Sequence, residues 1–151
     1  MTKIIEKNEI KDILKSNSIL AIGGFTLNRK PIEIIKEICE SNLKDFHIYT
    51  LGGSLDVDLL LKNSKIKKIS AAYVGYEGLG ISRQFRENVE NKKIEFEDLT
   101  EIIYYFRLKS GAEKIPFLTT ESVINSEILK INSACEKFIN NSGKELCKVF
   151  P

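Results

Sequence analysis

The chain has 151 residues, of which 42% are hydrophobic and 29% charged, and its formal net charge is +2. This balance is typical of a folded globular protein and excludes a disordered chain. Interspersed basic and acidic residues give no electrostatic signature of a nucleic-acid-binding or membrane-surface protein. No apolar segment reaches the length of a membrane span, and the first residues lack a signal-peptide apolar region. We therefore expect a cytoplasmic protein with a single domain over residues 1–151.

The cysteines and the single histidine indicate no catalytic or metal centre. Cys39, Cys135 and Cys147 are widely spaced, odd in number and contain no C-x-x-C pair. This pattern argues against a disulfide framework and against a zinc site, so we expect no bound metal. His47 lies in a strand-like run, and any serine or cysteine catalytic set based on histidine would have to use it. Nothing in the sequence favours such a set.

Helical and strand patterns alternate along the chain. Apolar periodicity predicts helices over residues 2–15, 31–42, 56–61, 82–91, 99–110 and 122–130, and strands over residues 18–23, 46–51, 69–74, 94–97, 115–119 and 146–150. Ser82 is a predicted N-cap, and Gly111 is expected at the end of its helix. The alternation predicts an α/β fold in which a mostly parallel sheet is covered by helices in three layers.

Three successive predicted strands end in glycine. The first runs into Gly23-Gly24, the second into Gly52-Gly53, and the third into Gly75. Because the carboxyl ends of parallel strands lie at one edge, we expect these segments side by side, around a crevice suited to a bulky anionic or nucleotide-like ligand. The spacing matches neither the dinucleotide fingerprint nor a phosphate loop. The alternative is that each glycine only forms a strand-end turn.

Several segments carry a resemblance to a known family. They are, in chain order, Gly23-Gly24-Phe25-Thr26 with Arg29-Lys30-Pro31, Gly52-Gly53, Asp56-Val57-Asp58-Leu59-Leu60, Ala72-Tyr73-Val74-Gly75-Tyr76-Glu77-Gly78-Leu79-Gly80, and Ile115-Pro116-Phe117-Leu118-Thr119-Thr120. Together they resemble the A (α) subunit of family I coenzyme A transferases, in particular the glutaconate CoA-transferase type. The resemblance covers roughly residues 16–151 in the right order.

This resemblance implies an acyl-CoA:carboxylate CoA-transferase that works by covalent catalysis. In the family a glutamate attacks the acyl-CoA thioester, becomes an acyl anhydride, and then a glutamyl-CoA thioester. That glutamate belongs to the B subunit, in a Ser-Glu-Asn-Gly motif that this chain lacks. The resemblance therefore implies that the chain supplies no catalytic residue and pairs with a B subunit in a hetero-oligomer. Acyl-CoA and a carboxylic acid are the implied substrates, with no separate cofactor.

The resemblance also implies which residues form one wall of the CoA and acyl site. The candidates are Gly23, Gly24, Phe25, Thr26, Arg29, Gly52, Gly53, Ser54, Gly75, Tyr76, Glu77 and Glu101. Glu77 directly follows the third strand and is expected to point at the crevice. Glu101 falls where many relatives place the glutamine of a Pro-Gln-Gly motif, so its polar role stays open. For both carboxylates the alternative is a solvated surface acid.

Family members continue beyond the strand at which this chain ends, Val149-Phe150-Pro151. We therefore expect a domain that is incomplete at its C-terminus: a fragment, the product of a split gene, or a reduced relative. Missing strands would leave a sheet edge uncovered, which predicts association with B subunits or self-association. Two other readings stay open: a non-catalytic module of this fold that binds CoA esters or sugar phosphates, or a truncated remnant.

Overall fold

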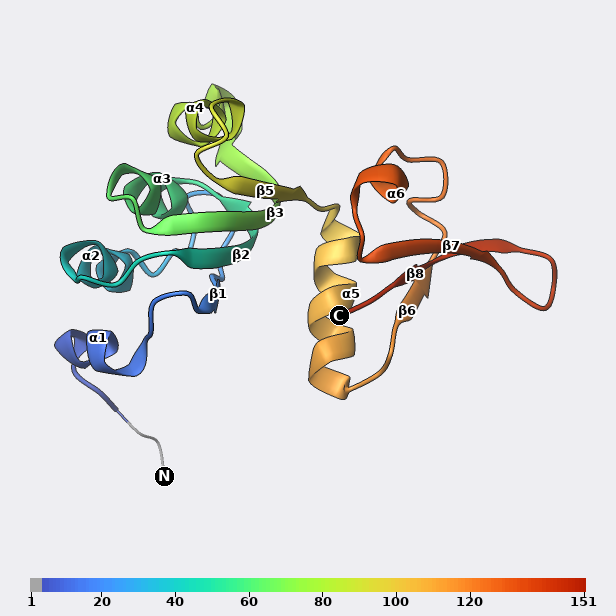
Figure 1. Cartoon of the computed structure of the whole chain (residues 1–151), viewed down its shortest axis with the longest axis horizontal. Coiled ribbons are helices and arrows are strands. Elements are labelled where there is room, and N and C mark those ends of the chain that lie inside the picture. Colours follow the sequence, from blue (N-terminus) through green and yellow to red (C-terminus); the bar gives the residue numbers. More distant parts are fainter. Residues whose placement is uncertain (1–3) are drawn as a thin grey trace. The chain divides into compact units, whose positions relative to one another are not determined.

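The computed structural model describes residues 4–151, and the chain forms two compact units. The first unit extends to Glu97, and the second runs from Asp98 to Pro151. Each has its own sheet, with five strands in the first unit and three in the second. Figure 1 labels most of the elements of both units.

A mostly parallel sheet forms the first unit. Its strands are β1 (Ile19–Ala21), β2 (Phe46–Gly53), β3 (Ile66–Tyr76), β4 (Gly80–Ile81) and β5 (Glu95–Asp98). The order is β1-β2-β3-β4, and β5 also pairs with β3. β1 and β3 both run parallel to β2, whereas β4 is a short antiparallel addition to β3. The predicted α/β class and mostly parallel sheet are confirmed.

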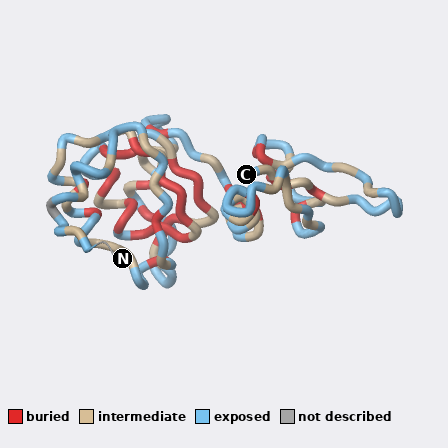
Figure 2. The backbone as a smooth tube through the Cα atoms, turned by 90° about the horizontal axis from the view of Figure 1, so that it is seen from below, coloured by how far each residue is buried: buried red, intermediate tan, exposed pale blue. Residues whose placement is uncertain are grey.

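Helices pack on one face of this sheet and bury the main core. They are α2 (Ile32–Glu40), α3 (Leu55–Lys62) and α4 (Arg83–Glu90). Ile35 of α2 and Leu60 of α3 belong to one buried cluster with Ile48 of β2 and Ile69 of β3, which are register partners and so share one face of the sheet. Ser82 is the N-cap of α4, as predicted, and accepts a hydrogen bond from the Phe85 amide at 3.1 Å. Most of the buried residues of this unit lie in β2, α3 and β3, and Figure 2 colours buried residues red.

Two predictions for the first unit are wrong in extent. The opening helix, predicted over residues 2–15, is a 3-10 turn, η1 (Lys7–Glu9), and one helical turn, α1 (Ile10–Ile13); residues 1–3 lie outside the described part. Leu14 is already extended, and so short a helix gains little from its own hydrogen bonds. The second and third strands are longer than predicted and include their glycines, because β2 runs through Gly53 and β3 runs past Gly75.

An antiparallel sheet distinguishes the second unit. Its elements are α5 (Glu101–Glu113), β6 (Leu118–Thr120), α6 (Ile128–Ile131), β7 (Cys135–Ile139) and β8 (Glu145–Val149), with strand order β6-β8-β7. The sequence did not predict β7, and the predicted helix over residues 122–130 is wrong apart from the turn of α6. A turn around Gly143 joins β7 to β8 as a hairpin.

Helix α5 ends later than predicted. Thr100 caps its start by accepting a hydrogen bond from the Ile103 amide at 3.2 Å. Gly111 lies inside the helix, and the left-handed residue that ends it is Lys114, at φ 55°. A glycine within reach of a helix end is therefore not always the residue that adopts the left-handed conformation.

Candidate functional site

Three loops meet at the carboxyl end of the parallel sheet, as the glycine pattern predicted. Register pairs Gly53 of β2 with Val74 of β3, the residue before Gly75. The segment after β1 reaches the same edge through a parallel bridge between Phe25 and Gly52. The Thr26 amide donates to the Gly52 carbonyl at 3.0 Å. The prediction that the three glycine segments lie side by side is confirmed.

The segment after β1 is a tight turn with an unusual backbone. Phe25 and Asn28 exchange main-chain hydrogen bonds of 3.1 and 2.9 Å. Gly24 has φ +85°, and a side chain on it would meet the Asn28 and Arg29 carbonyl oxygens at 2.6 and 2.7 Å. Thr26 and Arg29 also have positive φ, at 46° and 58°. A β-branched residue in this region is a clear outlier, so the surrounding contacts must hold the turn.

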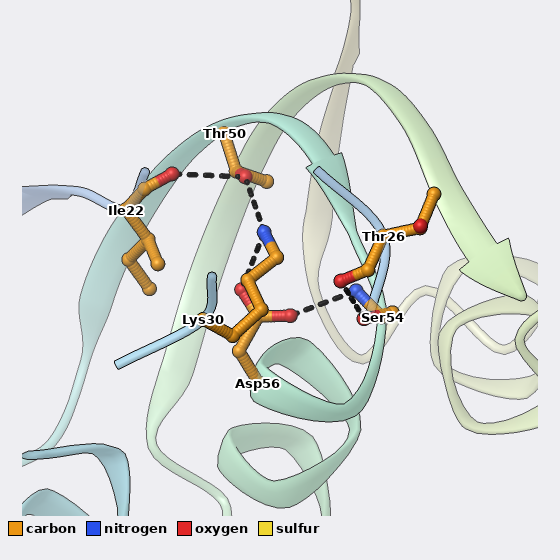
Figure 3. A network of polar contacts seen from close by, with 6 residues as sticks. All are labelled: Ile22, Thr26, Lys30, Thr50, Ser54 and Asp56. Carbon is orange, nitrogen blue, oxygen red and sulfur yellow. Dashed lines mark hydrogen bonds and ion pairs between the residues drawn. The ribbon is translucent and has the colours of Figure 1, made fainter. Parts of the chain in front are cut away.

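A buried polar network beneath the turn supplies those contacts (Figure 3). Lys30 Nζ lies 3.1 Å from Asp56 Oδ2, and the two side chains are only 1% and 0% exposed. Lys30 also donates to Thr50 Oγ1 at 3.4 Å, and Thr50 donates to the Ile22 carbonyl at 3.2 Å. The network thus joins the residue after β1, a residue of β2 and the first turn of α3.

Ser54 completes this network between the β2 end and the turn. Its amide donates to Asp56 Oδ1 at 2.8 Å, and its hydroxyl donates to the Thr26 carbonyl. Both carboxylate oxygens of Asp56 therefore face cationic or N–H groups, as a buried charge requires. Sequence reasoning placed Ser54 and Thr26 in the site but missed Lys30 and Asp56. Asp56 comes three residues after the end of β2, which was a usable signal, whereas Lys30 comes nine residues after the end of β1.

Glu77 lies at the solvent side of this site. It is exposed, and Thr26 Oγ1 donates to its Oε1 at 2.7 Å. The neighbouring Tyr76 hydroxyl donates to Asp58 Oδ2 at 2.6 Å, and the Ser82 hydroxyl donates to the other oxygen of Asp58. Burial and then the Asp58 hydrogen bond raise the pKa of Tyr76, so its hydroxyl stays protonated and remains a donor. β3 and α4 are thereby tied to α3 beside Glu77.

The glycines of the site differ in what surrounds them. A side chain on Gly53 would meet Val57 Cγ2 at 2.5 Å, and one on Gly75 would meet the Gly80 carbonyl at 2.5 Å. At Gly52 the Phe25 ring lies 3.0 Å away. Gly23 has no atom within 4 Å of that position. Of the site glycines, Gly23 alone therefore leaves its Cα open to an external ligand, while packing inside the protein accounts for the others.

Exposed apolar side chains cluster on the same loops. They are Phe25 and Leu27 after β1, Leu55 after β2, and Leu79 and Ile81 after β3. Leu79 is 89% exposed. An open hollow of about 460 Å³ lies here, lined by Gly24, Phe25, Asn28 and Arg29. Large apolar side chains gathered around a polar site are typical of an interaction surface.

Glu101 belongs to the second unit, where it is the exposed first residue of α5. A carboxylate in the first turn of a helix is favoured by the helix dipole, which is a structural reason for an acid at this position. Its predicted part in the site stays a prediction.

His47, Ser70 and Glu97 form a hydrogen-bonded chain on the sheet face opposite the main core. His47 Nε2 lies 2.7 Å from Ser70 Oγ, and Ser70 in turn donates to Glu97 Oε2. Ser70 lies between His47 and Glu97, whereas in a catalytic triad the histidine lies between the serine and the carboxylate. Ser70 is also 0% exposed. Among the described residues, no group of three or more His, Cys, Asp or Glu side chains could hold a metal ion.

No helix in the described part of the chain is long and apolar enough to span a membrane. Similarity to known proteins covers most of the sequence. The family described as Coenzyme A transferase matches residues 5–130. The A subunit of glutaconate CoA-transferase from Acidaminococcus fermentans is 32% identical over 122 residues, or 78% of this chain and 38% of that protein. The cholesterol ring-cleaving hydrolase IpdA subunit of Mycobacterium tuberculosis is 25% identical over 116 residues, or 76% and 39%.

The fold agrees with this similarity. The crystal structure of glutaconate coenzyme A-transferase from Acidaminococcus fermentans superposes with a TM-score of 0.83 at 25% identity, covering 95% of this chain and 51% of that one. The chain thus spans about half or less of the proteins it matches. Sequence, fold and the convergence of the three glycine segments agree: the chain belongs to the coenzyme A transferase family.

Proposed function

We propose that the chain is the non-nucleophile subunit of an acyl-CoA:carboxylate CoA-transferase in the cytoplasm. The observation that carries this proposal is the three-loop site, in a chain that resembles the A subunit of glutaconate CoA-transferase and lacks the Ser-Glu-Asn-Gly motif. A B subunit would supply the glutamate that attacks the thioester. This chain would supply one wall of the CoA and acyl site, with no other cofactor.

The geometry suggests how this wall would contribute to the reaction. Gly23 leaves main chain open to a ligand, and Glu77 is exposed beside a turn whose backbone is already ordered. A rigid wall of this kind lowers the entropic cost of orienting an acyl-CoA against a nucleophile from the partner. Main-chain N–H groups at the open edge would face the charge that develops on the thioester oxygen.

The first test is reconstitution. The purified chain alone is expected to show no transfer of CoA from an acyl-CoA to a carboxylate. Co-expression with a B subunit that carries the Ser-Glu-Asn-Gly motif is expected to give turnover and a trappable glutamyl-CoA adduct on that partner. Turnover by the isolated chain, or an adduct on one of its own glutamates, would contradict the proposal.

The similarity to a ring-cleaving hydrolase subunit favours a second candidate, in which this chain is one subunit of a hydrolase. The same reconstituted complex separates the two. A transferase gives a new acyl-CoA whose amount depends on the acceptor acid, whereas a ring-cleaving hydrolase consumes its substrate with no acceptor acid present. A complex that binds CoA esters but performs neither reaction would support the non-catalytic module.

Partner binding can be tested at Leu79. Changing this exposed apolar side chain to aspartate places a charge on the proposed contact surface, so the B subunit is expected to bind at least about tenfold more weakly. The free energy of unfolding of the chain should change by less than about 0.5 kcal/mol, because the side chain is exposed. Titration calorimetry and urea unfolding measure the two effects.

The matched control is Ile139→Asp, at an exposed apolar residue of β7 in the other unit. It introduces the same charge and is expected to leave the affinity unchanged. Equal loss of affinity in both variants, or in neither, would show that the loops after the parallel strands are not the partner surface.

A further inference from the structure

The turn after β1 presents a free guanidinium group beside the open hollow. Of the four residues that line this hollow, Arg29 is the one with a charge. Arg29 is exposed, and no ion pair or hydrogen bond joins its side chain to another residue in the described range 4–151. The other cation of the turn, Lys30, is buried against Asp56 at 3.1 Å. Arg29 is therefore the cation of this turn that can reach a ligand.

The backbone that carries Arg29 is held from both sides. Its φ of 58° is in the left-handed region, which non-glycine residues adopt at a cost. On one side Thr26 is fixed by its bonds to Gly52 and Glu77, at 3.0 and 2.7 Å. On the other side Lys30 is anchored in the buried ion pair. Such held, unfavourable backbone occurs preferentially at functional sites, where it fixes a group in place before the ligand arrives.

The chemistry of the turn selects one class of anion. A guanidinium fork matches the two oxygens of a carboxylate or phosphate. Multiply charged phosphate groups call for several cations, whereas this turn offers one and has the Glu77 carboxylate 2.7 Å from Thr26. A single carboxylate is the better electrostatic match. In CoA transfer the reacting carboxylate loses its charge when it becomes a thioester, so only a second carboxylate keeps an arginine partner throughout.

We propose that Arg29 is a specificity-determining residue that binds the non-reacting carboxylate of a dicarboxylic substrate. The inference rests on the proposed function for the identity of the reaction. Carboxylate binding by Arg29 does not depend on the proposed function and can be measured on the chain alone.

The test uses the full chain labelled with 15N and the probe monomethyl glutarate, which carries one free carboxylate and an ester in place of the thioester. At constant ionic strength the probe is expected to shift the amide signals of Gly24, Phe25, Asn28 and Arg29. Methyl butyrate, which has no carboxylate, should leave them unmoved. Arg29→Gln is expected to weaken binding about tenfold or more, since an ionic hydrogen-bond pair is lost. Arg29→Lys keeps the charge but not the planar fork, so its affinity for the probe should lie between those of Arg29→Gln and the unchanged chain.

Two further variants make the result decisive. Arg86→Gln removes an exposed arginine of α4 outside the hollow and is expected to bind the probe like the unchanged chain. Arg29→Asn removes the charge with a residue that tolerates left-handed backbone, so it should lose binding without loss of thermal stability. No shift with the probe, equal loss in Arg86→Gln, or tighter binding of inorganic phosphate than of the probe would each overturn the proposal.

The two proposals fail in distinguishable ways. A reconstituted complex that transfers CoA between dicarboxylic acids with an unchanged KM in Arg29→Gln would refute the role of Arg29 and leave the function standing. Arg29-dependent carboxylate binding by a chain that never supports transfer would do the reverse.

Discussion

Replacing Lys30 by methionine is expected to lower the free energy of unfolding by about 3–5 kcal/mol. The change leaves the Asp56 carboxylate, 0% exposed, without the cation 3.1 Å away. Asp56→Asn should also destabilise, because Lys30 is then the unpaired buried charge. The double variant Lys30→Met with Asp56→Leu should recover much of the loss, since it removes both charges together. Urea unfolding followed by circular dichroism measures all three.

Lys36 is a matched control that shows whether burial of the ion pair is the reason for the expected loss of stability. Lys36 pairs with Glu33 at 2.6 Å, but both side chains are more than half exposed. Lys36→Met is therefore expected to change the free energy of unfolding by less than about 1 kcal/mol. If Lys30→Met were equally mild, the buried network would not be what stabilises the turn.

Gly24→Ala is expected to destabilise the chain by about 2 kcal/mol or more and to abolish activity in a reconstituted complex. The methyl group would lie 2.6 Å from the Asn28 carbonyl, on a residue whose φ is +85°. The left-handed backbone alone costs alanine about 1–2 kcal/mol, and the contact with main-chain oxygen adds to it. Thermal unfolding and the transfer assay report the two losses.

The adjacent glycine is the informative comparison. Gly23→Ala meets no atom within 4 Å, so the free energy of unfolding should stay within about 0.5 kcal/mol. If a ligand approaches the main chain at Gly23, as we propose, the methyl group should still reduce affinity for an acyl-CoA in the complex. Unchanged affinity in Gly23→Ala would mean that the glycines of this turn serve packing alone.

The predictable part of the fold was the part built from strong periodic signals. Apolar runs followed by glycine located β1, β2 and β3, and their parallel direction followed from the helices between them. The second unit was less predictable because its elements other than α5 are short. β7 has the sequence CEKFI, with two charged residues in succession, so it lacks the apolar run that identified β1, β2 and β3. Its pairing with β8 depends on contacts between two segments of the chain, which the pattern within one segment does not show.

The position of the candidate site could be predicted from the sequence, but the buried contacts that hold it in place could not. Strand ends showed where the loops meet, and the family resemblance named Thr26, Ser54 and Glu77. The Lys30–Asp56 pair was hidden because charged residues in loops are usually solvated. Only the three-dimensional packing shows that both are buried. The same packing revealed that Gly53 and Gly75 are required by neighbouring protein atoms, which residue type alone does not reveal.

The hydrogen-bonded chain across β2, β3 and β5 fixes the tautomer of the single histidine. The one hydroxyl proton of Ser70 points to the Glu97 carboxylate, so the serine oxygen can only accept from His47. The imidazole must therefore carry its proton on Nε2, the nitrogen that a general base would need vacant. Ser70 is also 0% exposed, so its hydroxyl is closed to a substrate. The three residues that most resemble hydrolytic machinery in composition are thus arranged with a buried serine and with the histidine proton on the nitrogen that would have to accept one.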